Sequence, residues 1–418
     1  MIVRDALRSL RYSRSQAVFY WVTLLLTTTF LYLYFIMMMS DSVTAGFLTE
    51  GTDFLATAVT VTVIVICMIA ILYANSYFVR RKAPELAVRL ISGATYTQLS
   101  MYLLLQTLTL MILAMPLGIL IGRCSLPLLS RLVSQYAGVP YTITVGKDGI
   151  VMASVFLGFV VFWIIMLNLS FAYRNAANMM FNTSALAKGQ KAGVLYLEGL
   201  PSWLRTAASA ALFLIPAFLI AVNPHAAFLF ILMSAVGLHM FTGAVIVPLL
   251  TKRTVRSDAV HTAAYGFLRS DVQVLRLSTI LYFTDAVLLL SALTMKDGQP
   301  VEMAMYMLSY IVMNIMLSLA LLFQFSSELS LRNRYFTTLA NIGFTPKLRN
   351  GIQRQELTGL FGWLGILDIL YTGVLLVTVY IRGRITLPAA GLLFVLSIVP
   401  LILCAVLCRI HYRRVTRC

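Results

Sequence analysis

Long apolar stretches alternate with short polar segments along almost the whole chain. A helix needs about 20 apolar residues to cross the hydrocarbon core of a bilayer. The pattern therefore predicts ten membrane-spanning helices. They cover residues 17–39, 54–78, 100–122, 149–172, 205–222, 226–250, 277–295, 304–326, 357–381 and 387–408. Only Asn223, Pro224 and His225 separate the fifth stretch from the sixth, so a re-entrant hairpin is the alternative for that pair.

The basic residues between these stretches predict the orientation of the chain. With the N-terminus inside, 26 of the 32 Lys and Arg residues lie in cytoplasmic segments. Lys and Arg accumulate in cytoplasmic loops of membrane proteins, so both termini are expected in the cytoplasm. Omitting one span would place the later basic loops outside. The other six residues are Arg123, Arg131, Lys147, Lys296, Arg382 and Arg384.

Composition excludes several other classes of protein. The chain is 60% apolar and 11% charged, whereas soluble domains are about 25% charged. The net charge of +17 lies in short loops rather than on one soluble face, which argues against a nucleic-acid partner. No CxxC or HExxH spacing occurs, so no metal or redox site is expected.

Two segments on the predicted cytoplasmic side, residues 78–106 and 330–356, share one pattern at a constant offset of 250. Each has basic residues, an amphipathic helix, a glycine and a short polar turn before the next span. Internal duplication in a membrane protein often marks two halves around one pathway; two unrelated basic loops are the alternative. The aligned pairs are Gly93 with Gly343, Thr95 with Thr345 and Gln106 with Glu356.

The first of these segments carries a family resemblance. Its residues Glu85-Leu-Ala-x5-Gly93-Ala-Thr-x2-Gln98-Leu resemble the signature of FtsX/MacB-type ABC permeases, where a short cytoplasmic helix precedes the third span of a four-span unit. Arg4-Asp-Ala-Leu-Arg-Ser-Leu-Arg11 is similar to the amphipathic helix that opens that unit. The second copy departs from the pattern at Tyr335 and Phe344. Conversely, the acid expected at the start of the third span is present as Glu356 but is Gln106 in the first copy.

The resemblance implies an all-α integral membrane fold with two FtsX-like four-helix units joined by a two-helix insert. The units would cover residues 1–175 and 257–418, with the linker and insert at 176–256. This plan is similar to the ten-span BceB-like permeases, which are associated with antimicrobial peptide resistance. Those proteins carry a large external domain, for which the connection at 296–303 is too short.

The longest external connection, residues 123–148, contains apolar residues at helical spacing. Leu128, Leu132 and Tyr136 recur four residues apart, with polar residues between them. This predicts a helix over about 126–137 that lies on the outer membrane surface. A plain external loop is the alternative.

The chain has no GxxxxGK[ST] phosphate loop, so it is expected to be a non-catalytic subunit. The resemblance implies that ATP and Mg²⁺ bind to a separate ABC ATPase, present in two copies. Helices at about 82–93 and 332–343, parallel to the membrane, would contact it; the alternative is that they only bind anionic membrane lipid. The candidate coupling residues are Arg81, Lys82, Glu85, Arg89, Gly93, Arg332, Arg334, Tyr335, Gly343 and Glu356.

Two carboxylates, Asp285 and Asp368, lie within predicted spans. A charged side chain at the bilayer centre costs about 2.5–3.5 kcal/mol on the milder scale. They are either a site for a cationic group or groups bonded to a neighbouring helix. Separately, Gly118-x3-Gly122 in the third span would permit close helix approach.

Together these observations predict the permease subunit of an ABC transporter in a bacterial cell membrane. It would couple ATP hydrolysis on its partner to mechanotransmission, or to movement of a peptide or amphiphile at the outer leaflet. One alternative is an ion-coupled secondary transporter that uses Asp285 and Asp368. Another is a sensor or scaffold that relays membrane state to a hydrolase or to a histidine kinase.

Overall fold

The structure is a computed structural model that describes residues 5–6, 8–10, 14–40, 53–137, 143–181, 202–222, 227–255, 258–295, 300–381, 383 and 385–415. All regular structure in these residues is helical, because a backbone in lipid must satisfy its hydrogen bonds within its own segment. The helices are α2 (Arg14–Met38), α4 (Asp53–Ile91), α5 (Tyr96–Ala137), α6 (Lys147–Phe181), α7 (Ser202–Val222), α8 (Ala227–Phe241), the π-helix η2 (Thr242–Ile246), α9 (Val247–Val255), α10 (Ala259–Val274), α11 (Arg276–Met295), α12 (Pro300–Asn341), α13 (Pro346–Ile381) and α14 (Leu387–Val415).

Eight helical segments in the described part of the chain are long and apolar enough to cross a membrane. All ten predicted spans fall on helices, but the fifth and the seventh are not among the eight. In α7 only Trp203–Pro216 forms an apolar segment, which is short, and the side chains of α11 beyond Asp285 lie outside the described residues. The multi-pass, all-helical membrane architecture is therefore confirmed, whereas the number ten stays a prediction.

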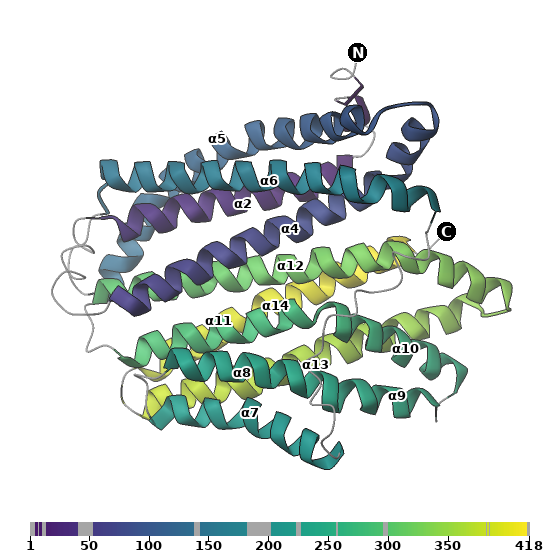
Figure 1. Cartoon of the computed structure of the whole chain (residues 1–418). Coiled ribbons are helices and arrows are strands. Elements are labelled where there is room, and N and C mark those ends of the chain that lie inside the picture. Colours follow the sequence, from purple (N-terminus) through teal and green to yellow (C-terminus); the bar gives the residue numbers. More distant parts are fainter. Residues whose placement is uncertain are drawn as a thin grey trace. The chain divides into compact units, whose positions relative to one another are not determined.

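The chain divides into two compact units whose boundary falls inside α12. The first contains Met1–Lys188 and Gly298–Val312, and the second contains Gly189–Asp297 and Met313–Cys418. Consecutive membrane helices run in opposite directions within each unit (Figure 1). The predicted two-helix insert, α7 with α8, packs within the second unit, where α8 contacts α11. The domain boundaries at 175 and 256 stay a prediction.

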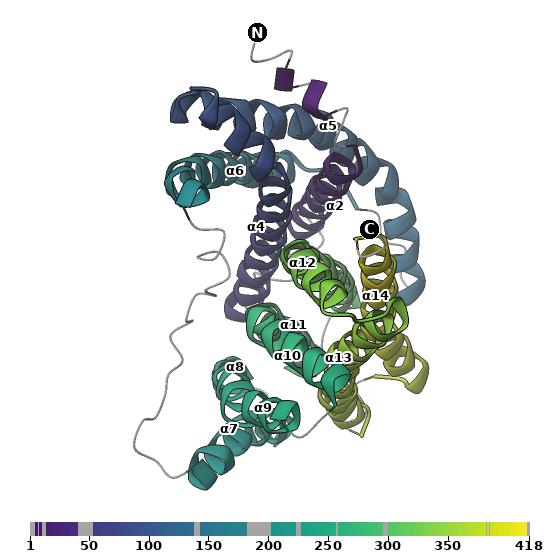
Figure 2. The same cartoon turned by 90° about the vertical axis from the view of Figure 1, so that its right-hand side faces the viewer.

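In the first unit, α2 packs closely against α5 (Figure 2). The contact is close because α5 presents Gly118 and Gly122 to α2. A Cβ atom on Gly118 would lie 2.8 Å from the Cβ of Thr28, and one on Gly122 would lie 2.7 Å from the ring of Tyr32. The hydroxyl of Thr29 also donates to the Gly118 carbonyl at 3.1 Å. The predicted role of these glycines in helix packing is confirmed.

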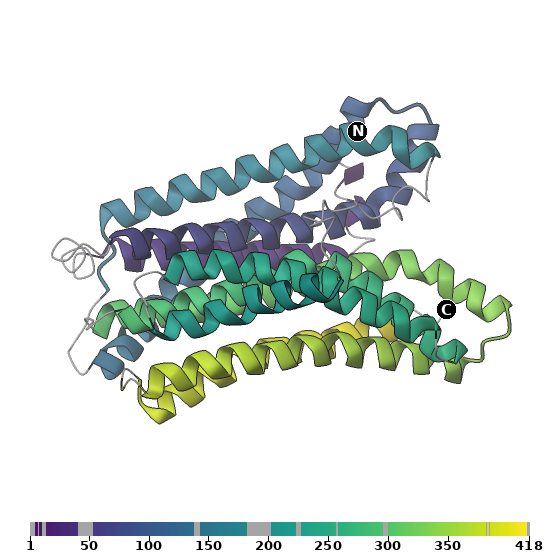
Figure 3. The same ribbon diagram turned by 60° about the horizontal axis from the view of Figure 1, so that its bottom comes forward.

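In the second unit, α13 and α14 lie side by side along most of their length (Figure 3). α10 packs on α13, and both contribute to a buried apolar core with α12 and α14. The core includes Leu268, Phe336, Ile352 and Tyr412. These four side chains come from four different helices, so the core fixes the positions of α10, α12, α13 and α14 near one end of the unit.

The prediction of short helices parallel to the membrane at 82–93 and 332–343 is wrong. Residues 82–91 are the last part of α4, a single helix of 39 residues. Residues 332–341 are likewise the last part of α12, a single helix of 42 residues. Each helix continues past its membrane span because no glycine interrupts it before Gly93 or Gly343.

The predicted helix over 126–137 is present, but it is the last part of α5 rather than a separate element. Figure 2 shows the later part of α5 turning away from the direction of its first part. Pro116 and Pro127 lie inside the helix, and proline kinks a helix because it removes a hydrogen bond and its ring clashes with the preceding turn. Leu128 is 62% exposed. The side chains of Leu132 and Tyr136 lie outside the described residues, so a role at the outer surface stays a prediction.

Candidate functional site

α4 ends at a tight turn around Gly93, and the backbone geometry of this first glycine turn (residues 89–95) requires glycine. Gly93 has φ +92°, a conformation that side-chain-bearing residues rarely adopt. Its N–H donates to the Leu90 carbonyl at 3.0 Å, and the Ala94 N–H donates to the Arg89 carbonyl at 3.1 Å. These two bonds define a Schellman motif, which satisfies carbonyls left free at the helix end.

α12 ends in the same way at the second glycine turn (residues 339–345). Gly343 has φ +99°. Its N–H donates to the Ala340 carbonyl at 3.0 Å, and the Phe344 N–H donates to the Leu339 carbonyl at 3.0 Å. Every donor and acceptor in this turn lies 250 residues after its counterpart in the first. The expectation that Gly93 and Gly343 close equivalent turns is confirmed in the backbone.

The residue after each turn starts the next helix, but by different chemistry. In the first turn Thr95 and Gln98 form a reciprocal cap, in which the Thr95 N–H donates to Gln98 Oε1 at 3.1 Å and the Gln98 N–H donates to Thr95 Oγ1 at 3.4 Å. In the second turn Thr345 is followed by Pro346, the first residue of α13. Proline at this position lacks only an N–H that the helix leaves free in any case.

A first charged cluster (Ser9, Lys82, Glu85 and Tyr102) lies beside the first turn. The Lys82 ammonium is buried; it donates to the Ser9 carbonyl at 3.4 Å and to Glu85 Oε2 at 3.2 Å. Glu85 also accepts from the hydroxyls of Ser9, at 2.8 Å, and of Tyr102. The cluster therefore joins α4 to α5 and to the leading helix, the N-terminal segment in which residues 5–6 and 8–10 are helical.

The environment of Glu85 favours its charged form. Partial burial alone would raise its pKa, but the hydrogen bonds from Tyr102 and Ser9 and the charge of Lys82 outweigh burial and lower the pKa below the usual range. Arg89 adds a second cation, whose guanidinium lies 4.0 Å from the centre of the Tyr102 ring and 3.5 Å from the Glu85 carboxylate. The carboxylate is therefore held between two basic residues of its own helix.

A second charged cluster (Asp271, Arg332, Glu356 and Tyr412) lies beside the second turn. Arg332 occupies the position of Lys82, is buried, and forms ion pairs with Asp271 of α10 and Glu356 of α13. It donates to Asp271 Oδ2 at 3.3 Å and to the Phe267 carbonyl at 3.5 Å. The Tyr412 hydroxyl of α14 donates to Glu356 at 2.6 Å. Burial raises the pKa of Asp271, although the Arg332 guanidinium opposes the shift.

The two clusters perform the same task with different residues. In the first half, Gln106 donates to the Ala6 carbonyl of the leading helix at 3.2 Å. In the second half, Glu356 occupies the position of Gln106 and reaches α10 through Arg332. Tyr335, which replaces the acid at the position of Glu85, makes an edge-on ring contact with Phe267 of α10 at 6.2 Å. Both halves thus attach a leading helix to the helix that ends in the glycine turn.

The predicted coupling residues separate into buried and exposed groups. Lys82, Arg332 and Glu356 are buried, so they position helices rather than offer side chains to a partner. Glu85 and Arg89 are half-buried, Tyr335 is exposed, and the side chain of Arg334 lies outside the described residues.

Ser9, Tyr102, Asp271 and Tyr412 were not predicted as members of the site. A signal for Asp271 is present in the sequence: Leu-Arg-Ser occurs at 7–9 and again at 268–270. This repeat marks α10 as the leading helix of the second half. Asp271 follows it directly, as Leu10 follows the first copy.

The two intramembrane carboxylates differ in their surroundings. Asp368 is buried and accepts hydrogen bonds from Thr372 at 3.0 Å and from Ser397 of α14 at 3.2 Å. Ser397 in turn accepts at its carbonyl from the Tyr282 hydroxyl at 2.7 Å. Asp285 is fully buried, and neither of its oxygens has a hydrogen-bond partner among the described residues. Asp368 therefore fits the interpretation as a group bonded to a neighbouring helix, whereas Asp285 does not.

Residues 57–177 match the family model of the FtsX-like permease C-terminal domain. The matched region includes Glu85, the first glycine turn and the start of α5, and it supports an FtsX/MacB-type ABC permease. Domains of this family are parts of transport subunits rather than catalytic enzymes, and such permeases generally pair with an ABC ATPase. No curated protein matches this chain.

Proposed function

We propose that the chain is the membrane subunit of an FtsX/MacB-type ABC transporter, in which both glycine turns dock on two copies of a separate ATPase. The observation that carries this proposal is the repetition of one turn geometry at an offset of 250 residues. Two equivalent turns on one chain would fit the two subunits of an ATPase dimer. The chain would then supply both docking sites, while ATP and Mg²⁺ bind to the partner.

Exposed apolar side chains beside the turns support docking of a protein there. Ile91 is 74% exposed and Ile342 is 70% exposed. Ile91 lies nine residues beyond Lys82, where the candidate span of α4 ends, which is about 13 Å of helix. Lipid tails would not cover a side chain at that distance from the span, and exposed apolar groups outside the membrane are typical of protein contacts.

The two clusters support a mechanism of coupling. Movement of a turn by the ATPase would be carried along α4 or α12 without a break, because each helix is continuous from the turn into the membrane. The leading helix of each half would move with it, since Lys82 and Arg332 attach it. Displacement at the cytoplasmic end would then change the positions of the outer ends of the spans, which is the mechanotransmission expected of this family.

The substrate would be met at or within the outer leaflet, because the external connections are too short for a large domain. A peptide or another amphiphile, such as an antimicrobial peptide, fits that geometry. The ten-span BceB-like plan, a cytoplasmic location for both termini in a bacterial cell membrane, and a histidine kinase as a sensing partner belong to this same proposal. A sensor or scaffold without substrate movement would use the same turns.

Co-purification tests the proposal directly. The full chain, solubilised from its native membrane, is expected to recover an ABC ATPase. Ile91→Asp and Ile342→Asp should each reduce the recovered ATPase, because a charge would replace a buried apolar contact. Ile381→Asp is the matched control, since Ile381 is equally exposed but ends α13 at the opposite end from the second turn. Absence of any ATPase in the wild-type preparation would refute the proposal.

The second candidate function, an ion-coupled secondary transporter, is favoured by Asp285 alone. A buried carboxylate without a partner is the kind of group that binds a proton or a cation within a membrane. Such a transporter would move substrate in proteoliposomes that contain this chain and an ion gradient but no ATPase. Lack of gradient-driven transport there, together with ATP-dependent transport after the partner is added, would exclude it.

A further inference from the structure

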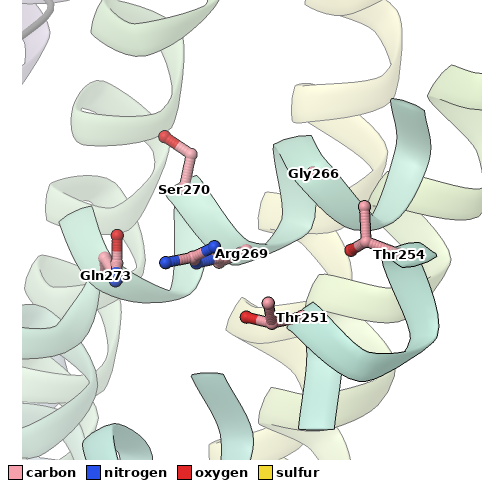
Figure 4. Close-up of a pocket in the computed structure, with 6 residues that line it drawn as sticks. All are labelled: Thr251, Thr254, Gly266, Arg269, Ser270 and Gln273. Carbon is pink, nitrogen blue, oxygen red and sulfur yellow. The ribbon is translucent and has the colours of Figure 1, made fainter. Parts of the chain in front are cut away.

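A pocket of about 330 Å³ lies between α9 and α10, away from both glycine turns (Figure 4). Every residue that lines it is polar or is glycine, which is unusual for a pocket at the end of a membrane helix. Thr251 and Thr254 come from α9, one turn apart. The others come from α10. The lining residues are Thr251, Thr254, Gly266, Arg269, Ser270 and Gln273.

The α10 residues of the pocket form one continuous face of that helix. Positions 266, 269, 270 and 273 follow the spacing of three, four and seven residues that places side chains on one side of a helix. The opposite side of α10 is buried through Ala264, Leu268, Asp271 and Val272. The polar side is therefore not the face that packs on the core of the unit, and it lies next to the hydroxyl groups of α9. The Thr262 hydroxyl donates to the Thr254 carbonyl at 3.1 Å and joins the two helices at the end of the pocket.

Arg269 gives the pocket a positive charge. Its side chain extends into the space between the two helices, near Gln273 and Thr251 (Figure 4). Arg269 is exposed, and no acidic residue in the described part of the chain forms an ion pair with it. The hydroxyl of Ser270 and the amide of Gln273 also have no hydrogen-bond partner among the described residues. A guanidinium with adjacent hydroxyl and amide donors is the arrangement that binds phosphate oxygens in proteins.

The position of the pocket along the chain indicates which phosphate it meets. The candidate span Leu229–Thr254 ends at the pocket wall, so Thr251 and Thr254 lie where a membrane helix leaves the hydrocarbon. Phospholipid headgroups occupy that depth, and basic side chains there attract anionic lipids.

From these contacts we infer that the α9–α10 pocket binds the phosphate group of an anionic lipid headgroup. Arg269 supplies the charge, and Ser270 and Gln273 supply further donors. Gly266 leaves the room for the ligand, because a Cβ atom added at this position would contact nothing within 4 Å. This site is independent of the proposed ATPase docking, since the lining residues include none of either glycine turn.

Binding is measured on the purified full chain in detergent by native mass spectrometry, with short-chain phosphatidylglycerol as the probe and phosphatidylcholine for comparison. The wild-type chain is expected to prefer phosphatidylglycerol. Arg269→Gln should weaken that binding about five-fold, the effect of one basic residue at an anionic surface. Gly266→Leu should weaken it comparably, by filling the pocket without a steric clash. Lys252→Gln is the matched control: Lys252 is an exposed cation of α9 outside the pocket, so its removal should leave binding unchanged.

A second arm separates the two sources of phosphate. Inorganic phosphate at concentrations comparable with the lipid should not displace phosphatidylglycerol. If it does, the pocket binds free phosphate and the lipid assignment is wrong. If Arg269→Gln and Gly266→Leu both bind phosphatidylglycerol as tightly as the wild type, or if phosphatidylcholine binds equally well, the inference is overturned.

Discussion

Lys82 and Arg332 lie 250 residues apart, and each is buried against a backbone carbonyl of the leading helix of its own half. Lys82 reaches the Ser9 carbonyl at 3.4 Å, and Arg332 reaches the Phe267 carbonyl at 3.5 Å. The acids around them differ in position and in number. Lys82 pairs with one half-buried carboxylate three residues further along its own helix, whereas Arg332 pairs with two buried carboxylates from two other helices.

Removal of Arg332 should therefore destabilise the protein strongly. Arg332→Gln would leave Asp271 and Glu356 buried without a cation, a change that costs about 3–5 kcal/mol. The triple variant Arg332→Met, Asp271→Asn, Glu356→Gln removes all the charges and should recover much of the loss. Thermal unfolding of the purified protein measures both. A triple variant less stable than Arg332→Gln alone would contradict this account of the cluster.

The equivalent change in the first half should have a smaller effect. Lys82→Gln leaves Glu85 with Arg89 and with a partly open side chain, so about 1 kcal/mol or less is expected. The same unfolding measurement compares it with Arg332→Gln. Equal losses from the two variants would show that the burial of the acids does not determine the cost.

The pH dependence of the first cluster follows from Glu85, which faces Lys82, Arg89, Tyr102 and Ser9. Because its folded pKa is lowered, its charged form stabilises the fold. That contribution is present above the usual glutamate pKa of about 4.3 and is lost as pH falls through the lower folded pKa. Glu85→Gln should therefore lower Tm at pH 7, and the difference from the wild type should shrink as the pH falls below 4. A difference that grows on acidification would refute the assignment.

The conformation of Gly93 predicts which substitutions disrupt the first turn. Gly93→Val would force a β-branched residue into positive φ, at a cost of about 1–3 kcal/mol. We expect it to reduce the recovered ATPase or to uncouple ATP hydrolysis from function. Gly93→Asn is the matched control, because asparagine tolerates the left-handed region. Gly343→Val should act in the same direction but more weakly, since the first turn lies within the region matched to the family.

The two intramembrane acids should respond differently to neutralisation. Asp368→Asn keeps the shape of a side chain already bonded to Thr372 and Ser397, so transport should persist with a modest loss of stability, about 0.5–1.5 kcal/mol. Asp285→Asn removes a charge that has no described partner. Under ATP-driven coupling it should leave transport intact, whereas under ion coupling it should abolish it. Transport assays in proteoliposomes distinguish the outcomes.

Cysteine labelling from outside tests the number of spans. In a variant without native cysteines, His261→Cys should be inaccessible and Asn223→Cys should be labelled if α7 and α11 both cross the membrane. If neither crosses, the segment that contains His261 lies outside and is labelled. Arg81→Cys should stay unlabelled in both cases, which makes it the control for membrane integrity.

Much of the fold was predictable because hydrophobic length is a direct consequence of bilayer thickness. The turns at Gly93 and Gly343 were also predictable, since positive φ favours glycine and the offset of 250 aligned them. The ends of α4 and α5 were not, because an amphipathic continuation and a separate surface helix have the same pattern of apolar residues. Nor was the pairing of Asp271 with Arg332, since the two residues are 61 positions apart and meet only when α10 packs beside α12.

The unbroken length of α4 has a mechanical consequence. A straight helix of 39 residues is about 58 Å long at 1.5 Å per residue, and backbone hydrogen bonds make it stiff against bending. It can therefore act as a lever arm. A rotation of about 5° about its cytoplasmic end would displace the opposite end by about 5 Å, close to one helical pitch. A small angular change at Gly93 would thus become a displacement large enough to alter which side chains face each other at the far membrane surface.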